Sequence, residues 1–222
     1  VYNSLFKFGF GFIEVGTVTP KQQLGNPKPR IFRLEKDEAL INRLGFNNHG
    51  SETVSRRISN NHPDGFLGIN IGPNKETKNK EEDYYICLSR LAMHAGYITI
   101  NISSPNTEGL RNFHDQEEMK KLLSGINKII KEKKIECPVA IKISPDINDN
   151  EISKIVDLVS SHKIQGIIVS NTTDSNRNNL SDIKKHETGG LSGQPLKDIS
   201  TSLIKKFYKE TKGKIKIIGV GG

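Results

Sequence analysis

Six short apolar runs, most followed by polar or glycine-rich residues, constrain the fold of this chain more than any other feature. We expect strands at residues 11–18, 66–72, 97–103, 138–144, 166–171 and 214–219. Apolar residues at helical spacing lie between several of them, most clearly at 119–130, at 152–159 with Asp149 as the cap, and at 199–208. Strands that are apolar on both faces and alternate with amphipathic helices predict a parallel sheet covered by helices.

A (β/α)8 TIM barrel is favoured over an open doubly wound sheet, because polar groups follow nearly every strand instead of gathering at one switch point. About six of the eight barrel strands fall within this chain, so we expect one further strand before Val1 and one after Gly222. No linker or shift of composition divides residues 1–222, which indicates a single domain. Residues 25–50 are too long for a simple loop and are expected to form an elaborated excursion from the barrel top.

The densest polar group follows the apolar run at residues 97–100. The run Asn101-Ile102-Ser103-Ser104-Pro105-Asn106-Thr107 places five neutral hydrogen-bonding side chains at the carboxyl end of that strand, with Ser104 at their centre. Barrel enzymes carry their chemistry at this end of their strands. A strand end followed by a serine- and asparagine-rich turn would give the same pattern.

Other polar groups stand out in apolar surroundings. Lys142 lies between two isoleucines, where an ammonium group is costly unless an anion or a strong acceptor meets it. Asn70 lies inside an apolar run, and the glycines at 189–193 and 219–222 could expose backbone N–H groups to a phosphate. An outward-pointing lysine, a satisfied core asparagine and two tight turns are the ordinary alternatives.

Together these groups could hold a flat heteroaromatic cofactor that carries a phosphate. A flat polar substrate stacked on it would need further amides, which Asn42, Asn101, Asn106 and Asn171 could supply. Ser104 could then accept a proton beside a hydride transfer. No other base is evident, because the sequence has no Ser/His/Asp order and no HExxH motif. It also has no ligand-spaced cysteines and histidines, so it predicts no metal site.

Charge and cysteine content limit the classes of binding partner and compartment that the sequence indicates. The net charge of +8 comes from lysines scattered over helix faces, without an arginine-rich patch, and therefore does not indicate a nucleic-acid partner. Cys87 and Cys137 lack metal-type spacing and are expected to be free thiols in a reducing compartment. No apolar run approaches the roughly 18 residues that span a bilayer.

Several long motifs resemble those of the class 2 dihydroorotate dehydrogenase family, and they occur in the family's order over nearly the whole chain. They are Gly16-Thr-Val-Thr-Pro20, Gly25-Asn-Pro-Lys-Pro-Arg-Ile-Phe-Arg-Leu34, Ile41-Asn-Arg-Leu-Gly-Phe-Asn-Asn48, Asn101-Ile-Ser-Ser-Pro-Asn106, Lys142-Ile-Ser-Pro-Asp146, Ser170-Asn-Thr-Thr173, Gly189-Gly-Leu-Ser-Gly193 and Gly219-Val-Gly-Gly222.

The resemblance implies a single FMN-binding barrel domain that oxidises dihydroorotate to orotate in de novo pyrimidine (UMP) biosynthesis. Ser104 matches the catalytic base that removes the C5 proton while hydride leaves C6 for the flavin. The implied FMN contacts are Thr17, Asn70, Asn101, Lys142, Ser170, Gly193 and Gly222. The implied pyrimidine site comprises Asn42, Arg43, Leu44, Gly45, Phe46, Asn101, Asn106, Asn171 and Thr172.

Serine instead of cysteine at position 104 resembles class 2, whose members pass electrons to a ubiquinone-type quinone, and Arg33 matches a residue lining the quinone site. Membrane association through an N-terminal segment outside these residues is then expected, at the cytoplasmic face of a bacterial inner membrane or at the mitochondrial inner membrane of a eukaryote. The alternatives are a class 1 dihydroorotate dehydrogenase, a dihydropyrimidine dehydrogenase, or a flavin-binding fragment without turnover.

Overall fold

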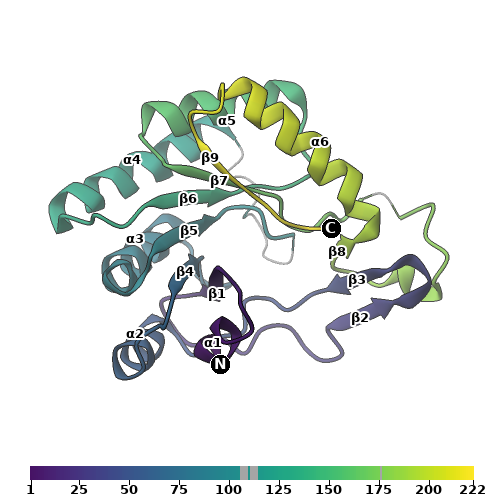
Figure 1. Cartoon of the computed structure of the whole chain (residues 1–222), viewed down its shortest axis with the longest axis horizontal. Coiled ribbons are helices and arrows are strands. Elements are labelled where there is room, and N and C mark those ends of the chain that lie inside the picture. Colours follow the sequence, from purple (N-terminus) through teal and green to yellow (C-terminus); the bar gives the residue numbers. More distant parts are fainter. Residues whose placement is uncertain (106–109, 111–114, 176) are drawn as a thin grey trace. The chain divides into compact units, whose positions relative to one another are not determined.

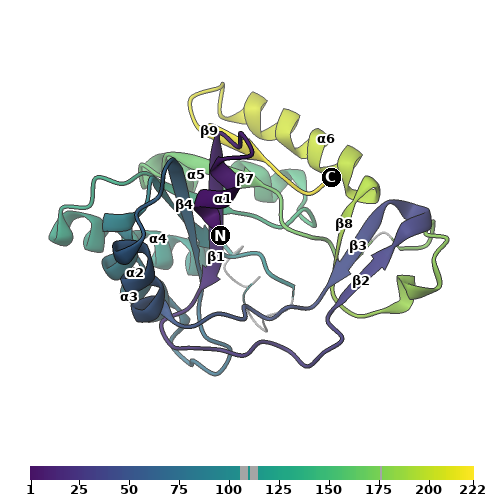
Figure 2. The ribbon, with the colours of Figure 1, turned by 60° about the horizontal axis from the view of Figure 1, so that its bottom comes forward.

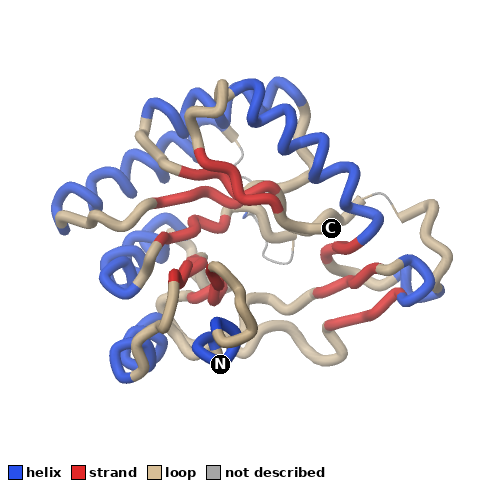
Figure 3. Tube along the Cα trace, viewed as in Figure 1, coloured by secondary structure: helices blue, strands red, loops and turns tan. Residues whose placement is uncertain are grey.

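The computed structural model describes residues 1–105, 110, 115–175 and 177–222. Within them the six expected strands form one parallel sheet in the order β1-β4-β5-β6-β7-β9, and Figures 1 and 3 show their alternation with helices. The strands are β1 (Phe12–Val18), β4 (Phe66–Ile71), β5 (Tyr97–Asn101), β6 (Val139–Lys142), β7 (Gly166–Val169) and β9 (Lys216–Gly219). The predicted strands and parallel sheet are therefore confirmed.

All but the first of the helices fall between these strands, and three of them lie where the apolar periodicity predicts a helix. They are α1 (Tyr2–Phe6), α2 (Ser51–Asn60), α3 (Lys80–Leu91), α4 (Gln116–Lys133), α5 (Asp149–Ser161) and α6 (Gln194–Glu210), with short 3-10 turns η1 (Glu35–Asp37), η2 (Ala92–His94) and η4 (Ile183–His186). One predicted cap is wrong by a residue. Asn148 caps α5, because its side chain accepts from the Glu151 N–H at 3.1 Å while the Glu151 carboxylate accepts from the Asn148 N–H at 2.7 Å.

The chain divides into two compact units, and β6 begins in the first and ends in the second. The first unit comprises residues 1–25, 46–101 and 121–140; the second comprises residues 26–45, 102–120 and 141–222. The expectation of a single domain over residues 1–222 stays a prediction.

The first unit is built on the parallel pairing of β1, β4 and β5. Ile13 pairs with Leu67 and Val15 with Ile69, and β5 continues the sheet on the other side of β4. α3 packs against β4 and against α2, as seen in Figure 1. The Tyr84 hydroxyl of α3 donates to the Asn101 carbonyl at 2.6 Å and so anchors the end of β5.

The second unit pairs β7 with β9 in parallel and adds a small antiparallel sheet. That sheet consists of β2 (Ile31–Leu34), β3 (Ala39–Asn42) and β8 (Gly190–Gly193), and Figure 2 shows the β2–β3 hairpin with β8 beside β3. Leu34, Ile41, Leu180 and Leu191 form its buried core. The expected excursion thus contains a hairpin. The alternative of a tight turn at 189–193 is wrong for most of that segment, since residues 190–193 are the strand β8.

Three properties concern the whole described chain. Cys87 and Cys137 are free thiols, of which Cys87 is buried. Among residues 1–105, 110, 115–175 and 177–222, no helix combines the length and apolarity needed to cross a membrane. The same residues hold no group of three or more His, Cys, Asp or Glu side chains arranged to bind a metal ion.

Candidate active site

In the first unit, a chain of side-chain hydrogen bonds links three predicted cofactor contacts. Asn101 Nδ2 donates to Thr17 Oγ1 at 3.0 Å, and Thr17 Oγ1 donates to Asn70 Oδ1 at 2.7 Å. Asn70 Nδ2 in turn donates to the Glu14 carboxylate at 2.8 Å. These bonds fix both amide orientations and use the hydroxyl proton of Thr17 within the chain. The structure therefore brings Thr17, Asn70 and Asn101 together on three adjacent strands.

Glu14 is the acceptor at the end of this chain, and sequence reasoning missed it. Its carboxylate also accepts from the Tyr97 hydroxyl at 3.0 Å and from Thr99 Oγ1 at 2.7 Å. Asn70, Tyr97 and Thr99 are all buried, so each donor depends on this one carboxylate or on a neighbour within the cluster. Burial, followed by the charge of Glu14 and its hydrogen bond, raises the pKa of Tyr97 above its ordinary value. The one available signal was an acidic residue inside an apolar strand.

Gly16 brings the backbone next to Thr17 close to Asn70. Its φ is +135°, and a Cβ at this position would lie 2.4 Å from the Asn70 carbonyl oxygen. Such an approach is open only to glycine. The Gly16-Thr17 pair is thus fitted against β4.

In the second unit, the polar residues that follow β5 meet those that follow β7. Ser103 and Ser104 are both buried, and Asn171 Nδ2 donates to Ser103 Oγ at 3.0 Å. The Asn171 N–H donates to the Ile143 carbonyl at 2.8 Å, and the Asn171 side-chain oxygen accepts from the Thr172 N–H at 2.8 Å. Ser104 is 5% exposed, so bulk water has little access to its hydroxyl. Asn106, predicted to bind substrate, lies outside the described residues.

Three predicted FMN contacts also come together in this unit, around the start of α6. The Gly193 N–H donates to the Gly221 carbonyl at 2.8 Å, and the Ser170 N–H donates to the Val220 carbonyl at 2.9 Å. A Cβ at Gly222 would lie 2.3 Å from the Gly193 carbonyl oxygen and 2.8 Å from the Lys197 nitrogen. α6 begins directly after Gly193, and no described side chain caps it.

The Gln194 N–H donates to the Glu38 carbonyl at 3.1 Å and Pro195 has no N–H. The helix dipole and the later N–H groups of the first turn are therefore what favour a phosphate at this glycine cradle. Lys142 is half-buried at the end of β6, between the fully buried Ile141 and Ile143. The donor set of the second unit therefore suits a phosphate group and an electron-accepting group beside Lys142.

The predicted pyrimidine segment, residues 42–46, divides between the units. Asn42, Arg43, Leu44 and Gly45 belong to the second unit, whereas Phe46 belongs to the first. Arg43 pairs with the Glu187 carboxylate at 2.8 Å, and its guanidinium carbon lies 4.4 Å from the centre of the Phe32 ring. Asn26 Nδ2 holds the Arg43 carbonyl at 3.0 Å.

Arg33, the predicted quinone-site residue, is exposed on β2. Its carbonyl accepts from Lys184 Nζ at 3.2 Å. This contact leaves the guanidinium role of Arg33 untested, and the assignment stays a prediction.

Comparison with known proteins identifies the family. The sequence model described as dihydroorotate dehydrogenase matches residues 1–222. The chain is 47% identical over 231 residues to the dihydroorotate dehydrogenase (quinone) proteins of Yersinia pseudotuberculosis serotype O:1b and Yersinia pestis bv. Antiqua (strain Angola). Each alignment covers 99% of this chain and 67% of the relative.

Solved structures give the same result. The Eimeria tenella DHODH in complex with ferulenol matches with a TM-score of 0.90 and 41% identity, over 97% of this chain and 64% of that one. Its ligand-free form matches with a TM-score of 0.90 and 40% identity, over 96% and 66%. The chain thus spans about two-thirds of the length of the relatives it matches.

The likeness to these structures, together with six parallel strands alternating with helices, confirms the expected fold class, a (β/α)8 barrel of which this chain holds six strands. The expectation from the sequence motifs is confirmed as well: this chain belongs to the dihydroorotate dehydrogenase family.

Proposed function

We propose that the protein carrying this chain oxidises dihydroorotate to orotate in de novo pyrimidine biosynthesis, with FMN as cofactor and a quinone as electron acceptor. The observation that carries the proposal is a buried hydroxyl, Ser104, three residues after β5 and beside the Ser103–Asn171 hydrogen bond. The names of the relatives, dihydroorotate dehydrogenase (quinone), support both the reaction and the acceptor.

FMN would be held by the seven residues that the motifs predict as its contacts. Ser170, Gly193 and Gly222 would surround its phosphate, where the start of α6 favours an anion. Lys142 would supply a cation, and Thr17, Asn70 and Asn101 would contribute the hydrogen-bonding groups that their mutual bonds leave available. When bound, FMN supplies the two-electron acceptor that no side chain can provide.

Ser104 would act as the base that takes the C5 proton of dihydroorotate at its Oγ. A neutral hydroxyl can accept that proton only while it releases its own, so a relay is needed. Thr107 with a water molecule is the relay that the sequence offers, although Thr107 lies outside the described residues. Burial of Ser104 favours a directed relay because bulk water is excluded.

The substrate would be bound by Asn42, Arg43, Leu44, Gly45, Phe46, Asn101, Asn106, Asn171 and Thr172. The quinone would approach Arg33 on β2. Contact with a membrane, at the cytoplasmic face of a bacterial inner membrane or at the mitochondrial inner membrane, would come from a segment outside these residues.

The direct test is anaerobic mixing of the full-length protein with dihydroorotate while flavin absorbance is followed. We expect bleaching that a soluble quinone reverses and that fumarate or NAD does not. Bound flavin that never bleaches would contradict the proposed substrate. Bleaching reversed by fumarate or NAD instead of quinone would contradict the proposed acceptor.

Ser104→Ala tests the proposed base. Flavin reduction should slow by roughly 10²–10⁴-fold, the usual contribution of a general base, with unchanged FMN content. Ser153→Ala, a matched change on the exposed face of α5, should have no effect. Ser104→Cys should make the rate depend on ionisation of a thiol, whose ordinary pKa is about 8.5. A near-normal rate in Ser104→Ala would exclude Ser104 as the base.

A further inference from the structure

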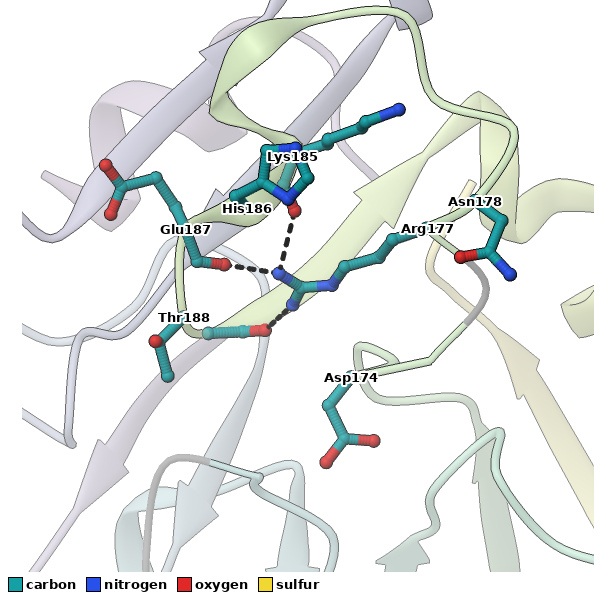
Figure 4. Close-up of a pocket in the computed structure, with 8 residues that line it drawn as sticks. Asp174, Arg177, Asn178, Lys185, His186, Glu187 and Thr188 are labelled. Atoms are coloured by element: carbon teal, nitrogen blue, oxygen red, sulfur yellow. Dashed lines mark hydrogen bonds between the residues drawn. The ribbon is translucent and has the colours of Figure 1, made fainter.

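The Arg177 side chain binds the loop that leads from η4 into β8. Its guanidinium donates to three main-chain carbonyls of that loop: Lys185 at 3.3 Å, Glu187 and Gly189. Figure 4 shows the three carbonyls converging on the two terminal nitrogens, at the wall of a pocket of about 500 Å³. A planar guanidinium with several fixed donors suits this task better than an ammonium group.

The loop bound by Arg177 contacts the proposed substrate-binding segment, residues 42–46. The Glu187 carboxylate pairs with Arg43 at 2.8 Å, and the Thr188 carbonyl accepts from Arg43 at 3.0 Å. Gly189 follows, so close to Asn42 that a Cβ would lie 2.4 Å from the Asn42 carbonyl oxygen. Three successive loop residues therefore determine where Asn42 and Arg43 lie.

The next residues reach the other side of the proposed pyrimidine site. A Cβ at Gly190 would lie 1.9 Å from Thr172 Oγ1 and 3.2 Å from Pro105 Cγ, so this glycine packs directly on both. Leu191 and Thr173 then exchange backbone hydrogen bonds at 2.6 and 3.1 Å. The loop held by Arg177 thus runs from Arg43 to Thr172.

The remaining guanidinium nitrogen argues against a purely stabilising role. Arg177 Nε is buried and has no hydrogen-bond partner among the described residues. A buried donor without a partner costs free energy, and a residue selected for stability alone would avoid it. The guanidinium is thus oriented so that its terminal nitrogens bond the loop carbonyls, while Nε is left without a hydrogen-bond partner among the described residues.

We propose that Arg177 is a positioning residue of the substrate site, which fixes the loop at residues 185–190 so that Arg43, Asn42 and Thr172 are held ready for the substrate. This inference rests on the proposed function for the identity of the substrate. The part of the inference that concerns the loop, namely that Arg177 fixes its position, is independent of the proposed function and can be measured separately.

The experiment compares Arg177→Lys and Arg177→Ala with Arg56→Ala, a matched change at an exposed arginine of α2, in the full-length holoenzyme. Hydrogen–deuterium exchange should rise in the 184–191 peptide of both Arg177 variants and stay unchanged in β4 and β5. The KM for dihydroorotate should rise on the order of tenfold, with a much smaller change of kcat, because misplaced binding groups weaken binding of substrate and transition state alike.

Guanidinium ions added well below denaturing concentrations should restore both the exchange pattern and the KM of Arg177→Ala and do nothing for Arg177→Lys. Wild-type exchange and KM in Arg177→Lys would overturn the proposal. So would faster exchange spread evenly over the protein, since that would indicate lost stability. If the wild type does not turn over dihydroorotate, the proposed function fails, while exchange in the 184–191 peptide still decides whether Arg177 holds the loop.

A double variant tests the path through Glu187. If Arg177 acts on Arg43 through this loop, Glu187→Gln and Arg177→Lys disturb the same contact path. The KM of the double variant should then rise by less than the product of the two single fold-increases. Fully multiplicative effects would contradict the shared route.

Discussion

Each unit contains a cluster organised by one charged side chain, but the two clusters are built from different partners. In the first unit, Glu14 accepts hydrogen bonds from three buried side chains on β4 and β5. In the second, Arg177 donates to three backbone carbonyls of one loop. The partners of Glu14 can be changed one at a time by mutation, whereas those of Arg177 cannot. The first cluster is therefore specified by several residues and the second by one.

Their settings also differ. The Glu14 cluster lies within a parallel sheet, where opening one hydrogen bond requires opening the strands. The Arg177 cluster lies on a loop with a half-buried guanidinium. Loops open locally at a small fraction of the global free energy of unfolding, whereas central strands open only with the whole unit. The first cluster should contribute to overall stability, and the second to local order.

Glu14→Ala should give the largest effect. It leaves the buried donors of Asn70, Tyr97 and Thr99 without their acceptor, and at about 1–3 kcal/mol for each unsatisfied group the free energy of unfolding should fall by roughly 3–9 kcal/mol. Urea unfolding of the full-length protein measures this loss, and FMN content should fall with it. Glu14→Gln, which keeps one acceptor oxygen, should lose about half as much. An equal loss in Arg177→Ala would contradict the difference between the clusters.

Gly16 and Gly189 allow a matched comparison of medium size. They have φ values of +135° and +137°, and a Cβ on either would lie 2.4 Å from a carbonyl oxygen, that of Asn70 or of Asn42. Substitution by alanine should cost each unit roughly 2–3 kcal/mol through backbone strain. The functional effects should differ: Gly16→Ala should lower FMN content, and Gly189→Ala should raise the KM for dihydroorotate.

Gly11→Ala is the control for this pair, because a Cβ there would meet no described atom within 4 Å. It should leave unfolding, FMN content and KM unchanged. Loss of FMN in Gly189→Ala at a normal KM would contradict the separate roles expected for the two glycines.

Strands could be predicted from the sequence where a run of apolar residues marks the strand. They could not be predicted where a strand exists only because it pairs with a distant segment of the chain. The six parallel strands could be found because each is a run of apolar residues. The four-residue strand β8 could not, because Gly190-Leu-Ser-Gly193 resembles a turn and becomes a strand only by pairing with β3, some 150 residues earlier in the chain. β2 and β3 are equally short and half-exposed, so they lack a periodic signal.

The site shows the same division. Asn70 and Asn101 could be singled out as polar residues in or beside apolar runs, and Thr17 by the family resemblance. The structure joins the three by hydrogen bonds. Glu14 becomes meaningful only when strand register surrounds it with donors. Arg177 gives no sequence signal, since its partners are carbonyls, which every residue possesses.

The smallest expected effect tests whether the first cluster is organised by a charge. Burial of Tyr97, and then the carboxylate of Glu14, raise the pKa of the Tyr97 hydroxyl. Because the folded value is raised, the contribution of Tyr97 to stability is complete below the unfolded pKa of about 10 and is lost as pH rises above it. Glu14→Gln removes the negative charge, so the pKa of Tyr97 should fall toward its ordinary value without reaching it, since burial remains.

Alkaline titration of tyrosine absorbance, with Tyr97→Phe to identify the signal among five tyrosines, measures this shift. The loss of stability at high pH should begin at the same pH in both proteins and be smaller in Glu14→Gln. A Tyr97 signal that does not move between wild type and Glu14→Gln would mean that the Glu14 carboxylate acts only as a neutral acceptor would. Of the two clusters, only the one around Arg177 would then depend on a charge for its organisation.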